Sequence, residues 1–118
     1  MSSSVISAAE WEVLGFFAVI PEPLDKDIPW PYNSFCYCVP QGELTLSCSI
    51  APAYKDVHII LTRAGTRLYE LNAVNVHDIR VSKTASDEAL EIEIRGGELV
   101  TLRLQPSIEI THAVLNEP

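Results

Sequence analysis

Strict alternation of apolar and charged residues over positions 89–106 constrains the fold more than any other feature of the chain. The segment reads ALEIEIRGGELVTLRLQP, with one alternating run on each side of Gly96-Gly97. A period of two places successive side chains on opposite faces of a β-strand. We therefore predict a β-hairpin with one charged face and one apolar face. The apolar face comprises Leu90, Ile92, Ile94, Val100, Leu102 and Leu104.

The loop of this hairpin must keep charges off the apolar face. A two-residue Gly96-Gly97 turn would set Glu91 opposite Leu102, and an unpaired carboxylate is costly to bury. A three-residue loop, either 95–97 or 96–98, restores the match. We favour 95–97, because it gives a glycine the left-handed position that follows a type I turn.

Short strand-like runs separated by Gly, Pro and polar residues fill the rest of the chain. Further strands are expected at 34–39, 43–50, 57–62, 66–71, 77–81 and 107–113. Their spacing of about 8–12 residues is typical of an all-β sandwich or barrel. Near the N-terminus we expect one short helical turn after Ser7 and then a strand over 13–20. The prediction is one antiparallel β-sandwich or flattened barrel of eight to nine short strands.

The whole chain of 118 residues is expected to form this single β domain. Residues 1–7 are expected to be frayed, 21–33 to form a proline-rich loop, and 114–118 to form a tail. The apolar run at 13–20 has the length of a signal-peptide core. Acids rather than bases precede it, so we read it as part of the fold.

Net charge limits the classes of partner. The chain carries 16 acidic and 8 basic residues, a formal charge of −8. Such a balance repels phosphate backbones and anionic lipid surfaces, so we expect neither nucleic acid nor membrane as a partner. A basic protein partner fits the charge, and self-association through a sheet edge is compatible with the pattern.

Cys36, Cys38 and Cys48 are too few, and odd in number, for a disulfide framework. This agrees with a reducing compartment, and we expect a cytoplasmic protein. A turn at 39–42 would place all three cysteines on one face of a hairpin. Zinc sites usually present C-x2-C on a turn, whereas this C-x-C lies inside an apolar strand. We therefore interpret the cysteines as core residues and expect no metal and no cofactor.

The proline-rich loop is the strongest candidate for a binding surface. Trp30 is flanked by two prolines, Tyr32 follows, and Asp25 and Asp27 lie just before them. Trp and Tyr are frequent in interface hot spots, and a stiff loop loses little entropy on binding. Trp30 can alternatively fold back as a lid on the sandwich. The binding-surface and lid interpretations are both correct if one aromatic ring covers the core and the other faces solvent.

Three functions follow from these features. The leading hypothesis is a non-enzymatic, acidic, cytoplasmic protein-binding module that blocks or stabilises a more basic partner. The first alternative is a small-molecule-binding β-barrel whose pocket is lined by Leu44, Leu46, Ile59, Leu61 and Tyr69. The second is a hydrolase-like enzyme that uses His58 and Glu70, which face each other across the 57–71 hairpin and would need a nucleophile.

Overall fold

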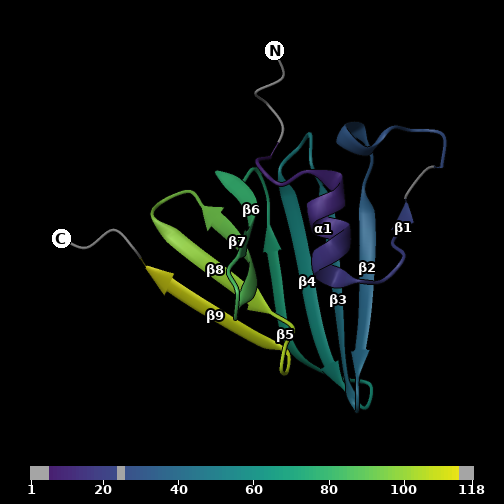
Figure 1. Cartoon of the computed structure of the whole chain (residues 1–118), viewed down its shortest axis with the longest axis vertical. Coiled ribbons are helices and arrows are strands. Elements are labelled where there is room, and N and C mark those ends of the chain that lie inside the picture. The colour runs from purple at the N-terminus through teal and green to yellow at the C-terminus, as the bar shows by residue number, and fades with distance from the viewer. Residues whose placement is uncertain (1–5, 24–25, 115–118) are drawn as a thin grey trace.

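The computed structural model describes residues 6–23 and 26–114, which form two antiparallel sheets and one α-helix (Figure 1). The all-β sandwich predicted from the sequence is confirmed. Residues 1–5 and 115–118, parts of the expected frayed end and tail, lie outside the described residues, as does Asp25. No helix in the described ranges is long and apolar enough to cross a membrane.

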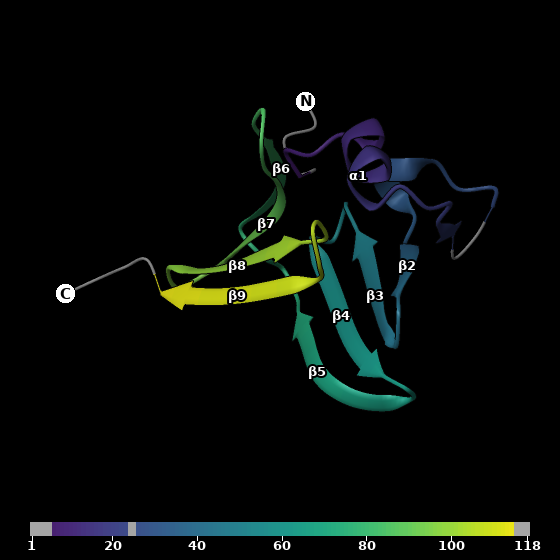
Figure 2. The same cartoon turned by 60° about the horizontal axis from the view of Figure 1, so that its bottom comes forward.

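The larger sheet has five strands in sequential order. They are β1 (Glu22–Pro23), β2 (Phe35–Gln41), β3 (Leu44–Ala51), β4 (Asp56–Arg63) and β5 (Thr66–Ala73). The smaller sheet has four, also in order: β6 (Asp78–Lys83), β7 (Glu88–Ile94), β8 (Glu98–Arg103) and β9 (Glu109–Val114). Figure 2 shows that β8 and β9 run at a steep angle to β4, so the strands of the two sheets are not parallel to one another.

The β7–β8 hairpin forms in the predicted register. Ile94 pairs with Glu98, which leaves 95–97 as the loop, and Gly96 and Gly97 adopt φ of +94° and +87°. Leu90 and Ile92 are completely buried in the core between the sheets. On the outer face, the Arg80 guanidinium donates to Glu91 and Glu93, each at 2.8 Å. The alternation therefore separates the faces as expected.

The expected strand over 13–20 is wrong, because most of this segment is helix α1 (Glu10–Phe17). The Glu12 carboxylate accepts from the Ala9 amide at 2.9 Å and caps the first turn. Ala18 ends the helix in a left-handed conformation with φ of +57°. Helical spacing turns three large side chains toward the core together, and this burial outweighs their preference for strand. The buried set is Val13, Phe16 and Phe17.

Residues 6–8 are packed on the smaller sheet, although the sequence predicted that the ordered part of the chain begins after residue 7. Ile6 is buried, and both the amide and the hydroxyl of Ser7 donate to the Asp78 carboxylate on β6. The Ala8 amide donates to the Ile79 carbonyl at 2.9 Å. The prediction that residues 6 and 7 are frayed is therefore wrong.

The predicted β2–β3 register is also wrong. Gln41 pairs with Leu44, so the turn is Gly42-Glu43, and Gly42 has the positive φ that such turns place first. Tyr37 and Val39 consequently face the core beside Cys48, while Cys36 and Cys38 lie on the outer face. Cys48 alone of the three cysteines is a core residue. The described residues contain no group of three or more His, Cys, Asp or Glu side chains placed to hold a metal ion.

Candidate functional site

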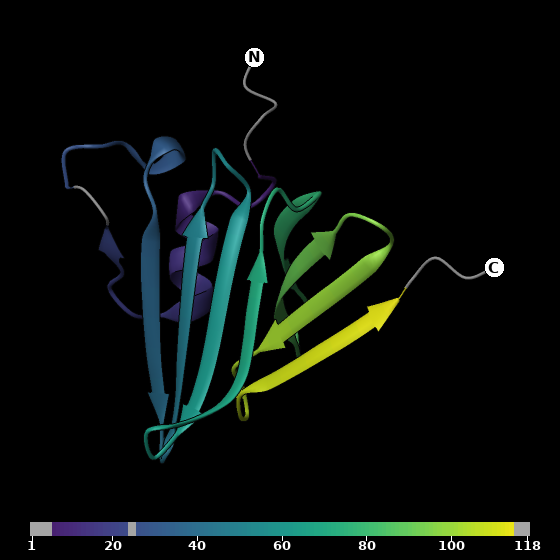
Figure 3. The same ribbon diagram turned by 180° about the vertical axis from the view of Figure 1, so that it is seen from behind.

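Helix α1 lies over the larger sheet, and the short 3-10 helix η1 (Trp30–Tyr32) lies near the end of that sheet where β2 begins (Figures 1 and 3). Aromatic contacts fix both to β2. Phe17 of α1 stacks on Tyr37 with ring centroids 4.6 Å apart, and Trp30 packs on Phe35 at 5.2 Å.

Hydrogen bonds of the backbone and of Asn33 connect residues 28–34, the C-terminal part of the proline-rich loop. The Tyr32 amide donates to the Pro29 carbonyl at 3.1 Å, which closes the single turn of η1. The buried Asn33 amide group donates to the Ile28 carbonyl at 2.9 Å and accepts from the Ser34 amide at 2.7 Å. Trp30 is half-buried against the core, whereas Tyr32 is 68% exposed. One ring covers the core and the other meets solvent, which is the combined arrangement considered above.

Large apolar side chains are exposed along the same stretch. Trp11, at 74% exposure, and Leu14 lie on the solvent face of α1, opposite its buried face, and Ile20 follows the helix. With Tyr32, these make four of the eight exposed large hydrophobic residues found in the described ranges. Residues 10–32 therefore concentrate apolar surface that the fold itself does not cover.

The same stretch concentrates negative charge. Residues 10–32 contain five acids, which are Glu10, Glu12, Glu22, Asp25 and Asp27, and one base, Lys26. The resulting charge of −4 is half of the total of −8, in about a fifth of the chain. We name residues 10–32 the acidic aromatic segment. Exposed aromatic anchors with acidic neighbours are suited to contact a basic protein surface.

Sequence reasoning found only part of this segment. It selected Trp30, Tyr32, Asp25 and Asp27, and their role in binding stays a prediction. It missed Trp11 and Leu14, because α1 was read mainly as a strand. The signal was present: with Val13, Phe16 and Phe17 on one helical face, Trp11 and Leu14 must lie on another.

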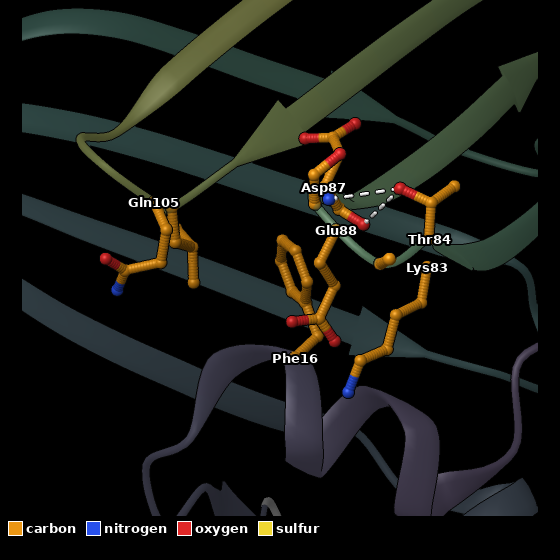
Figure 4. Close-up of a pocket in the computed structure, with 9 residues that line it drawn as sticks. Phe16, Lys83, Thr84, Asp87, Glu88 and Gln105 are labelled. Carbon is orange, nitrogen blue, oxygen red and sulfur yellow. Dashed lines mark hydrogen bonds between the residues drawn. The ribbon is translucent and has the colours of Figure 1, made fainter.

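Two small hollows lie between α1 and the β6–β7 hairpin. One, of about 230 Å³, is drawn in Figure 4 and lies between Phe16 and the β6–β7 loop. The other, of about 390 Å³, is lined by Trp11, Glu12, Gly15, Val81, Lys83 and Glu88. Lys83 and Glu88 line both hollows, and Figure 4 shows both side chains directed toward α1.

The proposed His58–Glu70 pair does form, on the outer face of the larger sheet. His58 Nε2 lies 2.7 Å from Glu70 Oε2, although a bulge in β4–β5 places Asn72 directly opposite His58. The hydrogen bond to His58, together with the nearby Arg67 charge, lowers the pKa of Glu70. The two side chains are 40% and 37% exposed. The pair thus joins two strands on an open sheet face.

Among the residues that the structure describes, no hydroxyl or thiol is hydrogen-bonded to the His58 ring. Ser49 on β3 is the direct cross-strand neighbour of His58, but within the described residues the hydrogen bond of the His58 ring is to Glu70. A general base must reach the hydroxyl that it activates. The geometry favours a hydrogen bond that holds β4 against β5 rather than acid–base chemistry.

Four of the five side chains expected to line an internal ligand pocket instead belong to the core or pack against it, whereas Leu44 is half-buried at the start of β3. Leu46 and Ile59 are completely buried, and Leu61 and Tyr69 pack against the same cluster. A ligand pocket needs several hundred Å³ of space that the protein leaves open. These residues therefore support packing between the sheets rather than a small-molecule site.

The fold and this surface define an all-β sandwich with an acidic aromatic end. No protein-family model and no curated protein sequence matches the chain. Among solved structures, the chain is similar to one from a contact-dependent growth inhibition toxin–immunity protein complex of Klebsiella pneumoniae 342. The similarity has a TM-score of 0.77 and covers 92% of this chain and 97% of that chain, at 17% sequence identity. At this identity the likeness establishes a shared fold.

Proposed function

We propose that this chain is an immunity-type module that binds a basic toxin domain and blocks it. The observation behind the proposal is the concentration of exposed aromatic residues and half of the net charge in residues 10–32. The fold shared with a chain of a toxin–immunity complex supports a protein partner of this kind. The His58–Glu70 geometry described above favours this binding role over the hydrolase alternative.

The acidic aromatic segment supplies both parts of a binding surface. Trp11 and Tyr32 offer rigid rings for burial, and such rings commonly dominate interface energetics. The surrounding carboxylates steer a basic partner toward this end and make association faster at low ionic strength. An immunity protein of this kind inhibits the toxin by covering its active or target-binding surface, and it needs no catalytic group of its own.

We also propose that the protein acts in the cytoplasm. Cys38 is exposed and Cys36 is half-buried, and both are free thiols in the structure. Exposed free thiols persist in a reducing compartment and are prone to oxidation outside it.

The test begins with the purified chain as bait and identifies the bound protein by mass spectrometry. Titration calorimetry then measures the affinity of the identified partner, and a growth assay asks whether the chain protects cells that produce it. Trp11→Ala combined with Tyr32→Ala should weaken binding by about 100-fold or more, as expected for two hot-spot residues. Leu68→Ala, an exposed residue on β5, is the matched control and should leave the affinity unchanged.

Two outcomes overturn the proposal in different ways. A partner that binds tightly but retains its toxicity in the presence of the chain contradicts the blocking function. Binding that survives the Trp11 and Tyr32 substitutions and weakens with Leu68→Ala contradicts the assignment of the surface.

A further inference from the structure

We propose that the 390 Å³ hollow beside Trp11 is a binding site for an arginine side chain of the protein partner. The proposal deepens the function given above and rests on it for the basic character of the partner. It names the chemical group that this part of the acidic aromatic segment recognises.

One wall of the hollow is flat, apolar and accessible. The Trp11 side chain is 74% exposed, and Val81 on β6 lines the same hollow. Gly15 also lines the hollow, and a Cβ added there would meet no atom within 4 Å, so this part of the hollow is open. A guanidinium group is planar and weakly hydrated, and it stacks on tryptophan better than other charged side chains do.

The charges around the hollow favour a cation. Glu12 and Glu88 contribute two carboxylates, against one ammonium from Lys83. Lys83 is the direct cross-strand neighbour of Glu88, but within the described ranges the Glu88 carboxylate makes no ion pair of 4.0 Å or less. Its neighbour Asp87 is held by Arg103 at 3.1 Å, and Figure 4 shows the Asp87 carboxylate directed away from α1. Glu88 is thus the carboxylate that remains available for a bidentate contact with a guanidinium.

Other occupants fit this combination less well. An anion would meet two carboxylates. A purely apolar side chain would cover Glu88 without giving it a partner, and covering an unpaired charge is unfavourable. Lysine would supply the charge, but its ammonium is compact and strongly hydrated and does not stack on the Trp11 ring as a plane. Arginine satisfies the ring and the carboxylate together.

Nuclear magnetic resonance tests the site without the partner. The chain contains two tryptophans, so a ¹⁵N-labelled sample gives one indole N–H signal each from Trp11 and Trp30, assigned with Trp11→Phe. The probe is acetyl-Gly-Arg-Gly-amide. We expect a saturable shift of the Trp11 signal and a static Trp30 signal. The citrulline analogue, a neutral isostere of arginine, and the lysine analogue should bind more weakly.

Two charge substitutions test the role of the carboxylate with opposite expected signs. Glu88→Gln should weaken the binding of the probe about threefold, and Lys83→Gln should tighten it by a similar factor. Glu43→Gln, on the exposed β2–β3 turn at the opposite end, is the control and should change nothing (Figure 1). Three results would each overturn the proposal. The arginine and citrulline probes could bind equally well, Lys83→Gln could weaken the binding of the arginine probe, or the Trp11 signal could fail to shift.

The peptide result and the partner result separate the two proposals. If a toxin partner is bound and blocked but the Trp11 signal does not respond to the peptide, the arginine site is wrong and the proposed function stands. If the peptide binds as described and the captured partner is not blocked, the arginine site stands and the immunity function is wrong.

Discussion

The ring of Phe17 lies almost parallel to that of Tyr37, with 16° between the ring planes. Both residues are buried, and this stack joins α1 to β2. Phe17→Ala should therefore lower the free energy of unfolding by about 3–5 kcal/mol, the usual cost of removing a buried phenylalanine ring. Leu14→Ala, on the exposed face of the same helix, should cost less than about 1 kcal/mol. Urea unfolding measures both, and equal losses would mean that α1 is not anchored through Phe17.

Alkaline pH should destabilise the fold through two core residues. Burial raises the pKa of the Tyr37 hydroxyl, with a further contribution from the Glu10 charge, and burial likewise raises the pKa of the Cys48 thiol. Because both pKa values are higher in the folded state, their contribution is complete below the unfolded values of roughly 8.5–10 and is lost as pH rises above them. The free energy of unfolding should fall above about pH 9. Tyr37→Phe keeps the ring and should flatten the decline, and an unchanged slope in this variant would contradict the assignment.

The parts of the fold that could be predicted from sequence are those where charge must stay out of the core. In the β7–β8 hairpin, moving the register by one residue would bury Glu91, so the alternation leaves two possible loops, 95–97 and 96–98. The preference of glycine for a left-handed conformation then selects 95–97. For Trp30 and Tyr32 the sequence left two roles open, a lid on the core and an exposed binding surface, and their division between the two rings depends on the packing of Trp30 on Phe35.

The errors arose where local pattern leaves two solutions. Tyr37 and Val39 alternate with Cys36 and Cys38, so both faces of β2 are apolar and the pattern does not choose between registers. The choice is made by the Gly42-Glu43 turn. Strand was predicted for α1 because aromatic and β-branched residues favour it locally, whereas packing on the sheets decides the outcome. Trp11 was missed as a consequence, since its exposure depends on the helix.

The Ser7–Asp78 contact should determine whether the N-terminal segment stays attached. Partial burial acts to raise the pKa of Asp78, but hydrogen bonds from the Ser7 hydroxyl and amide outweigh it, and the pKa is lowered. Asp78→Asn should cost about 1.5–3 kcal/mol near neutral pH, as for hydrogen bonds to a charged group. It should also speed hydrogen exchange of the Ala8 amide, which Ser82→Ala on the same strand should leave unchanged.

The pH dependence gives this prediction a second test. Because the folded pKa of Asp78 is depressed, its contribution is present above the unfolded value of roughly 3.9 and disappears as pH falls below it. Wild type and Asp78→Asn should therefore converge in stability in acid. A difference that is the same at neutral and acidic pH would show that the carboxylate charge is not what holds Ser7.

The turn between β4 and β5 contains an alanine in a conformation that favours glycine. Ala64 has φ of +49°, followed by Gly65 at +87°, as a two-residue hairpin turn of this hand requires. Ala64→Gly should raise the free energy of unfolding by roughly 0.5–1 kcal/mol, because relief of left-handed strain exceeds the added chain entropy. Gly65→Ala should lower it by about 1 kcal/mol or more. Thermal unfolding compares them, and a stabilising Gly65→Ala would contradict the turn geometry.

Cysteine reactivity should distinguish the observed β2–β3 register from the one that the sequence suggested. Cys38 is exposed, Cys36 is half-buried with its sulfur 3.4 Å from the Ser47 hydroxyl oxygen, and Cys48 is completely buried. The thiolate is the reactive form, and burial raises the pKa of the Cys48 thiol, so this side chain is both inaccessible and protonated.

In the native protein, a thiol reagent such as DTNB should therefore react rapidly with Cys38, more slowly with Cys36, and with Cys48 only after denaturation. Cys38→Ser should remove the fast phase alone. In the alternative register all three cysteines share one face, so Cys36 and Cys38 would be protected together with Cys48. If all three thiols react slowly in the folded state, the register suggested by the sequence is correct. If one thiol reacts rapidly and this phase disappears in Cys38→Ser, the result supports the pairing of Tyr37 with Cys48.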